Sequence, residues 1–285
     1  MTTPFQSSSN ALFHTVVRQV DRLSPGFLRV TVGGDQLHRF APYGLDQRIK
    51  ILVPHEGYPA VFDDELLHES EWRRRWRDLP GADRPVLRSY TVSAVRPEHR
   101  EVDLDFYVHE LPGPASDWAM RAVIGDRLLL SGPDVRLNDH RHGIQWAPGR
   151  AAEVLLAGDE TAFPAIRGIA LALRPAVHAR ILLEVGDPLD AVWLTDDLAA
   201  LPGLTVTVHE RGTDSGGSAL VRAVEDWTRQ HGAAAAAAET GFYAWLATES
   251  SQVATLRDLL HRTEIRSDRV HSQGYWNSRA RATLG

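Results

Sequence analysis

Between residues 88 and 116 the chain combines an arginine, an aromatic ring and a hydroxyl group with a glycine–proline turn. Arg88 brings a fixed positive charge and planar donors that suit a phosphate group. Tyr90 lies two residues further along, on the same face of a predicted strand, where its ring can stack against another ring. Thr91 adds a hydroxyl group suited to a ring nitrogen or carbonyl. These residue types fit a flat cofactor that carries phosphates.

The glycine–proline turn consists of Gly113, Pro114, Ala115 and Ser116, and it is predicted to open a short helix. Small residues at a helix start leave backbone N–H groups free to bind a pyrophosphate. The strand around Arg88 and this turn therefore predict a dinucleotide cofactor.

The second half of the chain contains another strand-to-helix turn, from Gly158 to Pro164. Its backbone N–H groups point beyond the edge of a predicted sheet, as in phosphate-binding turns, although it lacks the GxGxxG pattern. Taken by itself, the turn is equally well explained as a plain connection.

Charged residues after the following strands give conflicting indications about a nicotinamide nucleotide. Carboxylates such as those of Glu184, Asp187 and Asp190 bond ribose hydroxyls and repel a 2′-phosphate, which favours NADH. Arg211 is suited to receive that phosphate, which favours NADPH. Both nucleotides stay open, with a lean toward NADH.

The pattern of elements predicts an α+β protein with two domains. Residues 11–55 and 86–131 alternate as short strands between turns, which predicts an antiparallel β-barrel over 1–146. Strands and helices alternate over 150–285, which is typical of a parallel α/β sheet. A charged stretch near 60–84 predicts an inserted helix, either a basic docking patch or a solvated face with Trp72 and Trp76 packed inward.

Composition excludes several classes of function. The 285 residues carry a formal net charge of −6, which argues against a general nucleic-acid binder. The chain has no cysteine, so it forms no disulfide, iron–sulfur cluster or zinc–thiolate site, and no metal site is expected. The first residues lack a secretory pattern and no apolar run is long enough to span a membrane, so we expect a soluble, cytoplasmic protein.

Several motifs together resemble the siderophore-interacting protein family, a branch of the ferredoxin-reductase-like flavoproteins. They are RSYTV, DFYVHE, GPASDWA, GDRLLLSGP, LLAGDETAFPAI, FYAWLATES and GYW. The resemblance extends from about residue 11 to residue 283, and the order of the motifs is more specific than any one of them. It implies an N-terminal FAD-binding barrel and a C-terminal nicotinamide-binding domain.

The resemblance also implies the residues of the site. The implied cofactor-binding residues are Arg88, Ser89, Tyr90, Thr91, Val92, Asp105, His109, Gly113, Pro114, Ala115, Ser116, Trp118, Asp159, Glu160, Thr161, Trp245, Tyr275 and Trp276. Lys50, Arg136 and Asn277 are implied for substrate binding. For His109 a purely structural role is the alternative, and for Tyr275 and Trp276 the alternative is a hydrophobic plug. No side chain is expected to act as a catalytic acid, base or nucleophile.

Four positions depart from the family pattern. Ser93 replaces the last arginine of RxYTxR, and Asn277 replaces the arginine of GYWR. The family pattern has a His-Gly pair where this chain has His109 and Glu110, and the added carboxylate makes the site less basic. Thr248 replaces the glycine of AWxAGE, where a side chain narrows the approach of nicotinamide.

The resemblance implies an FAD-containing oxidoreductase that passes electrons from NAD(P)H to a ferric siderophore and releases ferrous iron. A flavin suits this task because it accepts two electrons and releases them singly. The departures keep two alternatives open. One is an FAD enzyme that oxidises or cyclises a small organic substrate, and the other is a binding protein that has lost redox turnover.

Overall fold

The computed structural model describes residues 9–63, 66–137 and 142–278. The chain divides into two compact units. The first contains Met1–Arg22 and Leu28–Ile144, and the second contains Leu23–Phe27 and Gln145–Gly285.

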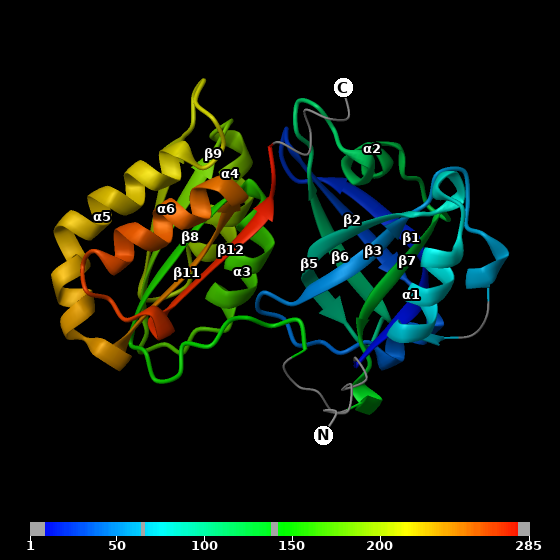
Figure 1. The fold of residues 1–285 in the computed structure, drawn as a ribbon, viewed down its shortest axis with the longest axis horizontal. Helices are drawn as coiled ribbons and strands as arrows, with labels where there is room; N and C mark the ends of the chain where they lie inside the picture. The colour runs from blue at the N-terminus through cyan, green and yellow to red at the C-terminus, as the bar shows by residue number, and fades with distance from the viewer. Residues whose placement is uncertain (1–8, 64–65, 138–141, 279–285) are drawn as a thin grey trace. The chain divides into compact units, whose positions relative to one another are not determined.

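The first unit is a closed antiparallel barrel, as the sequence predicts. Its sheet order is β2-β6-β5-β3-β7-β1-β4, and a further pairing of β2 with β1 closes it (Figure 1). The strands are β1 Asn10–Arg22, β2 Phe27–Gly33, β3 Arg48–Val53, β4 Leu67–His68, β5 Val86–Arg96, β6 Glu101–Tyr107 and β7 Arg127–Pro133. Alternate residues of β2, namely Leu28, Val30 and Val32, enter the barrel core, as the two-residue period of a strand requires.

The insertion between β3 and β5 holds a shorter helix than the stretch 60–84 suggests. A 3₁₀ turn at Ala60–Phe62 and strand β4 precede helix α1, Glu69–Asp78. Trp72 is fully buried, and Trp76 Nε1 donates a 2.8 Å hydrogen bond to the Pro85 carbonyl. The tryptophans therefore pack inward, as expected for a helix with a solvated outer face.

Two of the four arginines of α1 are paired with glutamates of the same helix. Arg73 pairs with Glu69 at 2.6 Å and Arg75 with Glu71 at 2.7 Å, both at the i, i+4 spacing. These pairs leave the outer face of α1 less basic than the letters RRRWR suggest.

The second unit is a parallel sheet of order β10-β9-β8-β11-β12 with helices on both faces (Figure 1). Its strands are β8 Glu153–Asp159, β9 His178–Val185, β10 Leu204–Glu210, β11 Phe242–Glu249 and β12 Val270–Trp276. Its helices are α3 Phe163–Leu171, α4 Leu189–Leu198, α5 Ser218–Ala237 and α6 Ser250–His261. On β8, Leu155 and Ala157 pack with α5 and α6, whereas Gly158 faces Ala162 and Ile166 on the α3 side.

Two elements of this unit are absent from the sequence-based expectation. Helix α4 connects β9 to β10, and β12 adds an edge strand parallel to β11. The alanine run 233–238 continues helix α5 as far as Ala237, as expected from the helix propensity of alanine. No helix in the described part of the chain has the length and hydrophobicity needed to cross a membrane.

Candidate functional site

Strand β5 carries five predicted cofactor residues in one run, from Arg88 to Val92. The Arg88 guanidinium donates a 3.0 Å hydrogen bond to the Leu87 carbonyl, and among the described residues it forms no ion pair. It therefore keeps its charge for an anion. Thr91 is 6% exposed, and Val92 belongs to the barrel core.

Aromatic contacts connect β5 to helix α2, Pro114–Arg121. The Tyr90 ring lies 4.6 Å from the Phe106 ring, and Phe106 lies 5.9 Å from Trp118 on α2 (centroid to centroid). Phe106 is fully buried and Trp118 is 8% exposed. The same core side chains thus support both Tyr90 and the helix.

The start of α2 fits a pyrophosphate. Gly113 is the N-cap, and no side chain caps the N–H groups of the first turn. A Cβ atom built on Gly113 meets nothing within 4 Å. Ser116 Oγ donates a 3.0 Å hydrogen bond to the Tyr107 carbonyl, and the His109 ring lies 4.6 Å from the Tyr107 ring. Uncapped donors beside open space are what an anionic phosphate needs.

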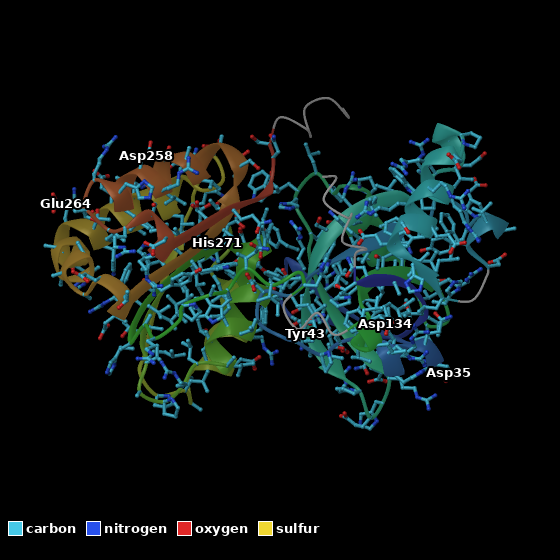
Figure 2. The ribbon with its side chains drawn as sticks, turned by 60° about the horizontal axis from the view of Figure 1, so that its bottom comes forward. Asp35, Tyr43, Asp134, Asp258, Glu264 and His271 are labelled. Atoms are coloured by element: carbon cyan, nitrogen blue, oxygen red, sulfur yellow. The ribbon has the colours of Figure 1, made fainter. Side chains whose placement is uncertain are left out.

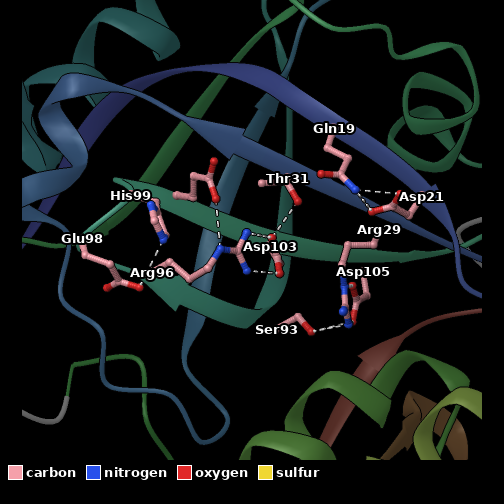
Figure 3. A network of polar contacts seen from close by, with 11 residues as sticks. Gln19, Asp21, Arg29, Thr31, Ser93, Arg96, Glu98, His99, Asp103 and Asp105 are labelled. Carbon is pink, nitrogen blue, oxygen red and sulfur yellow. Dashed lines mark hydrogen bonds and ion pairs between the residues drawn. The ribbon is translucent and has the colours of Figure 1, made fainter.

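Asp105, another predicted cofactor residue, lies on β6 with a fully buried side chain. Its carboxylate is paired with Arg29 of β2 at 2.7 Å and accepts a hydrogen bond from Ser93 of β5 (Figure 3). Sequence reasoning did not include Arg29.

The predicted substrate residue Lys50 lies on β3, and its Nζ donates a hydrogen bond to Ser89 Oγ. Partial burial lowers the pKa of Lys50, and the charges of Arg48 and Arg73 lower it further. The charge of Glu69, the partner of Arg73, acts in the opposite direction, so Lys50 lies among charges of both signs, with Arg48 as the neighbouring cation that sequence reasoning missed. The signal for Arg48 was its position two residues before Lys50, on the same face of the strand.

Arg136 lies apart from β3, in a 3₁₀ turn at Val135–Leu137. Its backbone N–H donates a 3.0 Å hydrogen bond to Asp134 Oδ1, and its side chain is exposed. Asp134, labelled in Figure 2, is itself paired with Arg39. The turn therefore holds the backbone of Arg136 while its guanidinium extends from the surface.

In the second unit, Asp159 ends β8 with no exposed surface. Its Oδ1 accepts hydrogen bonds from the Thr161 backbone N–H at 3.0 Å and from Thr161 Oγ1 at 2.5 Å. Its Oδ2 accepts from Thr248 Oγ1 at 2.8 Å and from Trp276 Nε1 at 2.7 Å. Burial, and after it the charge of Glu160, raises the pKa of the Asp159 carboxyl to about 6.

Glu160 and Glu184 share one arginine. Arg211 donates to Glu160 Oε1 and to Glu184 Oε1, each at 2.9 Å, and both carboxylates are buried. Burial alone would lower the pKa of Arg211, but the two carboxylates reverse this effect and raise it. Glu184 also accepts bonds from the backbone N–H groups of Gly217 and Leu220.

Most of the charged residues that were predicted to distinguish NADH from NADPH are therefore bound to other groups of the protein. Arg211 and Glu184 bind one another, and Asp190 accepts 2.7 Å hydrogen bonds from Ser24 Oγ and the Gly26 N–H. Asp187 is half-buried and accepts a 2.9 Å hydrogen bond from the Leu189 N–H at the start of α4.

The end of β12, an outer strand of the parallel sheet, lies at the same carboxyl edge as Asp159. Trp276 bonds Asp159, and a Cβ atom added to Gly216 would lie 2.4 Å from the Trp276 ring. The buried ring of Trp245 contacts Tyr275 and also His271, the latter labelled in Figure 2. Asn277 directly follows the strand.

The structure thus groups the predicted residues by unit. Within the barrel it combines β5, β6 and the start of α2, with Lys50 bonded to Ser89. Within the α/β unit it joins Asp159, Thr161 and Trp276 directly, and it links Trp245 to Tyr275.

Comparison with known proteins identifies both units. The profile described as the siderophore-interacting FAD-binding domain matches residues 16–137, and the profile described as siderophore-interacting protein matches residues 151–279. An NADPH-dependent ferric-chelate reductase of Escherichia coli is 28% identical over 93% of this chain and 92% of that protein. An uncharacterized protein of Mycobacterium bovis is 35% identical over 61% of this chain, and the match spans 57% of its own length.

Solved structures agree with these matches. The siderophore-interacting protein SipS from Aeromonas hydrophila superposes with a TM-score of 0.68 at 28% identity, covering 95% of this chain and 100% of that one. The two profiles together cover most of the chain, in the order in which the barrel and the α/β unit follow one another. The chain belongs to the siderophore-interacting protein family.

Proposed function

We propose that this protein is an FAD-containing reductase that passes electrons from a nicotinamide dinucleotide to the ferric iron of a siderophore. The observation that carries the proposal is Arg88 on β5, which forms no ion pair with any described residue, in the same barrel as the start of α2, where the N-cap glycine offers no side-chain cap. A fixed cation and a row of N–H donors suit one pyrophosphate. Residues 1–146 would bind FAD, and 150–285 would bind the nicotinamide nucleotide.

Each residue has a task in this proposal. Arg88 and the first turn of α2 bind the diphosphate, and Tyr90 covers one face of the flavin ring. Bound FAD supplies the conversion of a two-electron donor into single-electron transfers. Lys50 and Arg48 attract an anionic ferric chelate. Ferrous iron, being softer, is held less tightly by oxygen-rich chelators and leaves.

For the electron donor we propose NADH. Arg211, the only cation that the sequence offered for a 2′-phosphate, is engaged by two buried carboxylates. The three groups together carry a net charge of −1, which disfavours a further phosphate. The Escherichia coli relative is named for NADPH, so the preference would differ between the two proteins.

A second candidate, an FAD enzyme acting on a small organic molecule, is supported by the substitutions that remove positive charge. Asn277 and Ser93 stand where the resemblance has arginine, and the exposed Glu110 adds a carboxylate beside His109. A neutral substrate would not need the lost cations.

Turnover assays separate the two candidates. FAD-loaded protein is supplied with NADH and an anionic ferric siderophore while a ferrous-specific chromogenic chelator reports product. We expect ferrous iron to form at a rate that falls with rising salt, because exposed charges are screened. Oxidation of NADH without any ferrous iron would favour the organic substrate, and a protein that takes up no FAD would favour simple binding.

A further inference from the structure

Three neighbouring strands of the barrel hold a closed triangle of polar contacts (Figure 3). Strand β6 lies between β2 and β5. Arg29 of β2 donates from Nε to Asp105 Oδ1 at 2.7 Å and from Nη2 to Oδ2 at 2.9 Å. Ser93 of β5 donates to the same Oδ2 at 2.5 Å and accepts from Arg29 Nη2 at 3.2 Å. Each member therefore contacts both of the others.

The triangle is located at an irregularity of the strand that carries Arg88 and Tyr90. The pairing of β5 with β6 shifts register between Val92 and Ala94, so Ser93 is the bulged residue. A bulge bends its strand and changes the direction of nearby side chains, which is why bulges recur beside active sites. Here the Ser93 side chain anchors the bulge to Asp105, directly after the residues proposed to hold the flavin.

Arg29 supplies the positive charge of the triangle. The Asp105 side chain is fully buried and that of Arg29 is 19% exposed, so the carboxylate depends on its partners for stabilisation. Ser93 contributes a hydroxyl group, which donates a hydrogen bond but carries no charge. Without Arg29 the anchor of the bulge would be an uncompensated buried anion.

The same three strands contain a second set of contacts around a β6 aspartate, with the roles of the outer strands exchanged (Figure 3). Arg96 of β5 donates to Asp103 Oδ1 at 2.6 Å and to Oδ2 at 2.7 Å, and Thr31 of β2 donates to Oδ1 at 2.8 Å. Burial by itself would raise the pKa of Asp103, but the bonds from Arg96 and Thr31 lower it. The sheet thus accepts an arginine on either side of a β6 aspartate.

From this geometry we infer that Arg29 is a positioning residue for the flavin site. It acts through Asp105 and Ser93, holding the bulge so that Tyr90 and Thr91 keep the orientation needed to contact the ring. The family pattern has an arginine on β5 at position 93. In this chain Arg29 brings a positive charge to that position from β2. The inference rests on the proposed FAD site and assigns it a residue that the RSYTV motif does not contain.

The first test compares Arg29→Ala with Arg96→Ala. Both variants remove an arginine from a buried aspartate that also accepts a hydroxyl hydrogen bond, but only Arg29 contacts the bulged residue Ser93. Arg29→Ala should weaken FAD binding by roughly tenfold. This is the lower end of the loss seen when a residue that supports a binding residue is removed. It should also shift the flavin absorption spectrum. Arg96→Ala should lower the unfolding midpoint in urea while leaving FAD affinity and spectrum as in wild type.

The second test moves the arginine across Asp105. The exchange variant Arg29→Thr with Ser93→Arg reproduces the arrangement of Thr31 and Arg96 and should restore FAD affinity to near the wild-type value. If Arg29→Ala does not fold, Arg29→Gln with Asp105→Asn removes both charges, keeps hydrogen-bonding amides and should show the same loss of affinity.

The outcomes distinguish the positioning role from the proposed function. Wild-type protein that takes up no FAD would overturn both. Wild-type protein that binds FAD, with Arg29→Ala matching it in affinity and spectrum, would overturn the positioning role alone. Equal losses of FAD affinity in Arg29→Ala and Arg96→Ala would also overturn it, because any buried pair of the barrel would then have the same effect.

Discussion

Thr248 on β11 donates a 2.8 Å hydrogen bond to Asp159 on the neighbouring strand β8, and neither residue has any exposed surface. Glycine is the residue that the resemblance places at position 248. The threonine therefore adds a methyl group and a hydroxyl group at the carboxyl edge of the parallel sheet, where α/β sheets bind their ligands. A Cβ atom on Gly217 would lie 3.0 Å from Thr248 Oγ1, so the side chain fills this space tightly.

The first prediction concerns the size of residue 248. Thr248→Gly should speed the reduction of bound FAD by NADH by about tenfold, because it removes a side chain from the approach of nicotinamide. Tenfold is the lower end of the effect of one extra carbon group in a closely fitting pocket. It should also destabilise the fold by about 1–2 kcal/mol through the lost hydrogen bond. Rapid-mixing kinetics and urea unfolding measure the two effects.

Thr248→Ser is the matched control, because it keeps the hydroxyl group bonded to Asp159 and removes only the methyl group. An intermediate rate is expected for it. A glycine variant that reduces FAD no faster than wild type would show that Thr248 does not limit the approach of nicotinamide.

The second prediction concerns pH. The pKa of Asp159 is raised from 3.8 to about 6 in the folded protein, so the folded state binds this proton more tightly than the unfolded chain. The stability that Asp159 contributes is then greatest at low pH and falls as pH rises from about 4 to about 6. The full change is roughly 3 kcal/mol.

Asp159→Asn provides the comparison, since an amide does not titrate in this range. The free energy of unfolding of wild type minus that of the variant should decrease between pH 4 and pH 6. The misplaced amide donors of asparagine add a penalty of their own, but that penalty does not depend on pH. A difference that stays constant across the window would contradict the raised pKa.

The third prediction concerns the phosphate contact. Arg88→Ala should weaken FAD binding by about ten- to a hundredfold, the equivalent of one charge-assisted hydrogen bond of about 1.5–3 kcal/mol. Arg100→Ala is a suitable control because Arg100 is an exposed barrel arginine paired with Asp35. Fluorescence titration with FAD compares the two. Equal affinities in both variants would remove Arg88 from the site.

The fourth prediction concerns Arg211. Because Arg211 compensates two buried carboxylates, Arg211→Ala should destabilise the α/β unit by about 3–5 kcal/mol, and urea unfolding should detect the loss. A variant with wild-type stability that has specifically lost NADPH binding would instead make Arg211 the receptor of a 2′-phosphate, as one of the two sequence cues suggested.

Local patterns were sufficient to predict the barrel and most of the parallel sheet. Alternation over 11–55 and 86–131 identified the barrel strands, and apolar strands alternating with helices identified the α/β unit. Helix α4 was missed because its sequence, LDAVWLTDDL, mixes acidic and β-branched residues and so has weak helix propensity. The parallel pairing of β9 with β10 requires such a crossover, but that pairing is not visible in the sequence.

The polar partners of the site were harder to predict, because they come from distant strands. Arg29 reaches Asp105 across 76 positions of sequence, and nothing near Arg29 indicates that β2 and β6 are neighbours. The engagement of Arg211, which follows β10, similarly depends on Glu160 after β8 and Glu184 near the end of β9 meeting it at the sheet edge. By contrast, Arg88, Tyr90 and Gly113–Ser116 can be proposed as cofactor-binding residues from residue type and spacing alone, because one strand and one turn carry them.

Anaerobic sequential mixing tests electron transfer through this protein most directly. FAD-loaded protein mixed with NADH should lose its flavin absorbance at about 450 nm. A ferric siderophore added without oxygen should then restore that absorbance and yield about two ferrous ions per flavin, because each iron accepts one electron. Flavin that bleaches with NADH but regains its absorbance only when oxygen is admitted, with no ferrous iron formed, would contradict the proposed function.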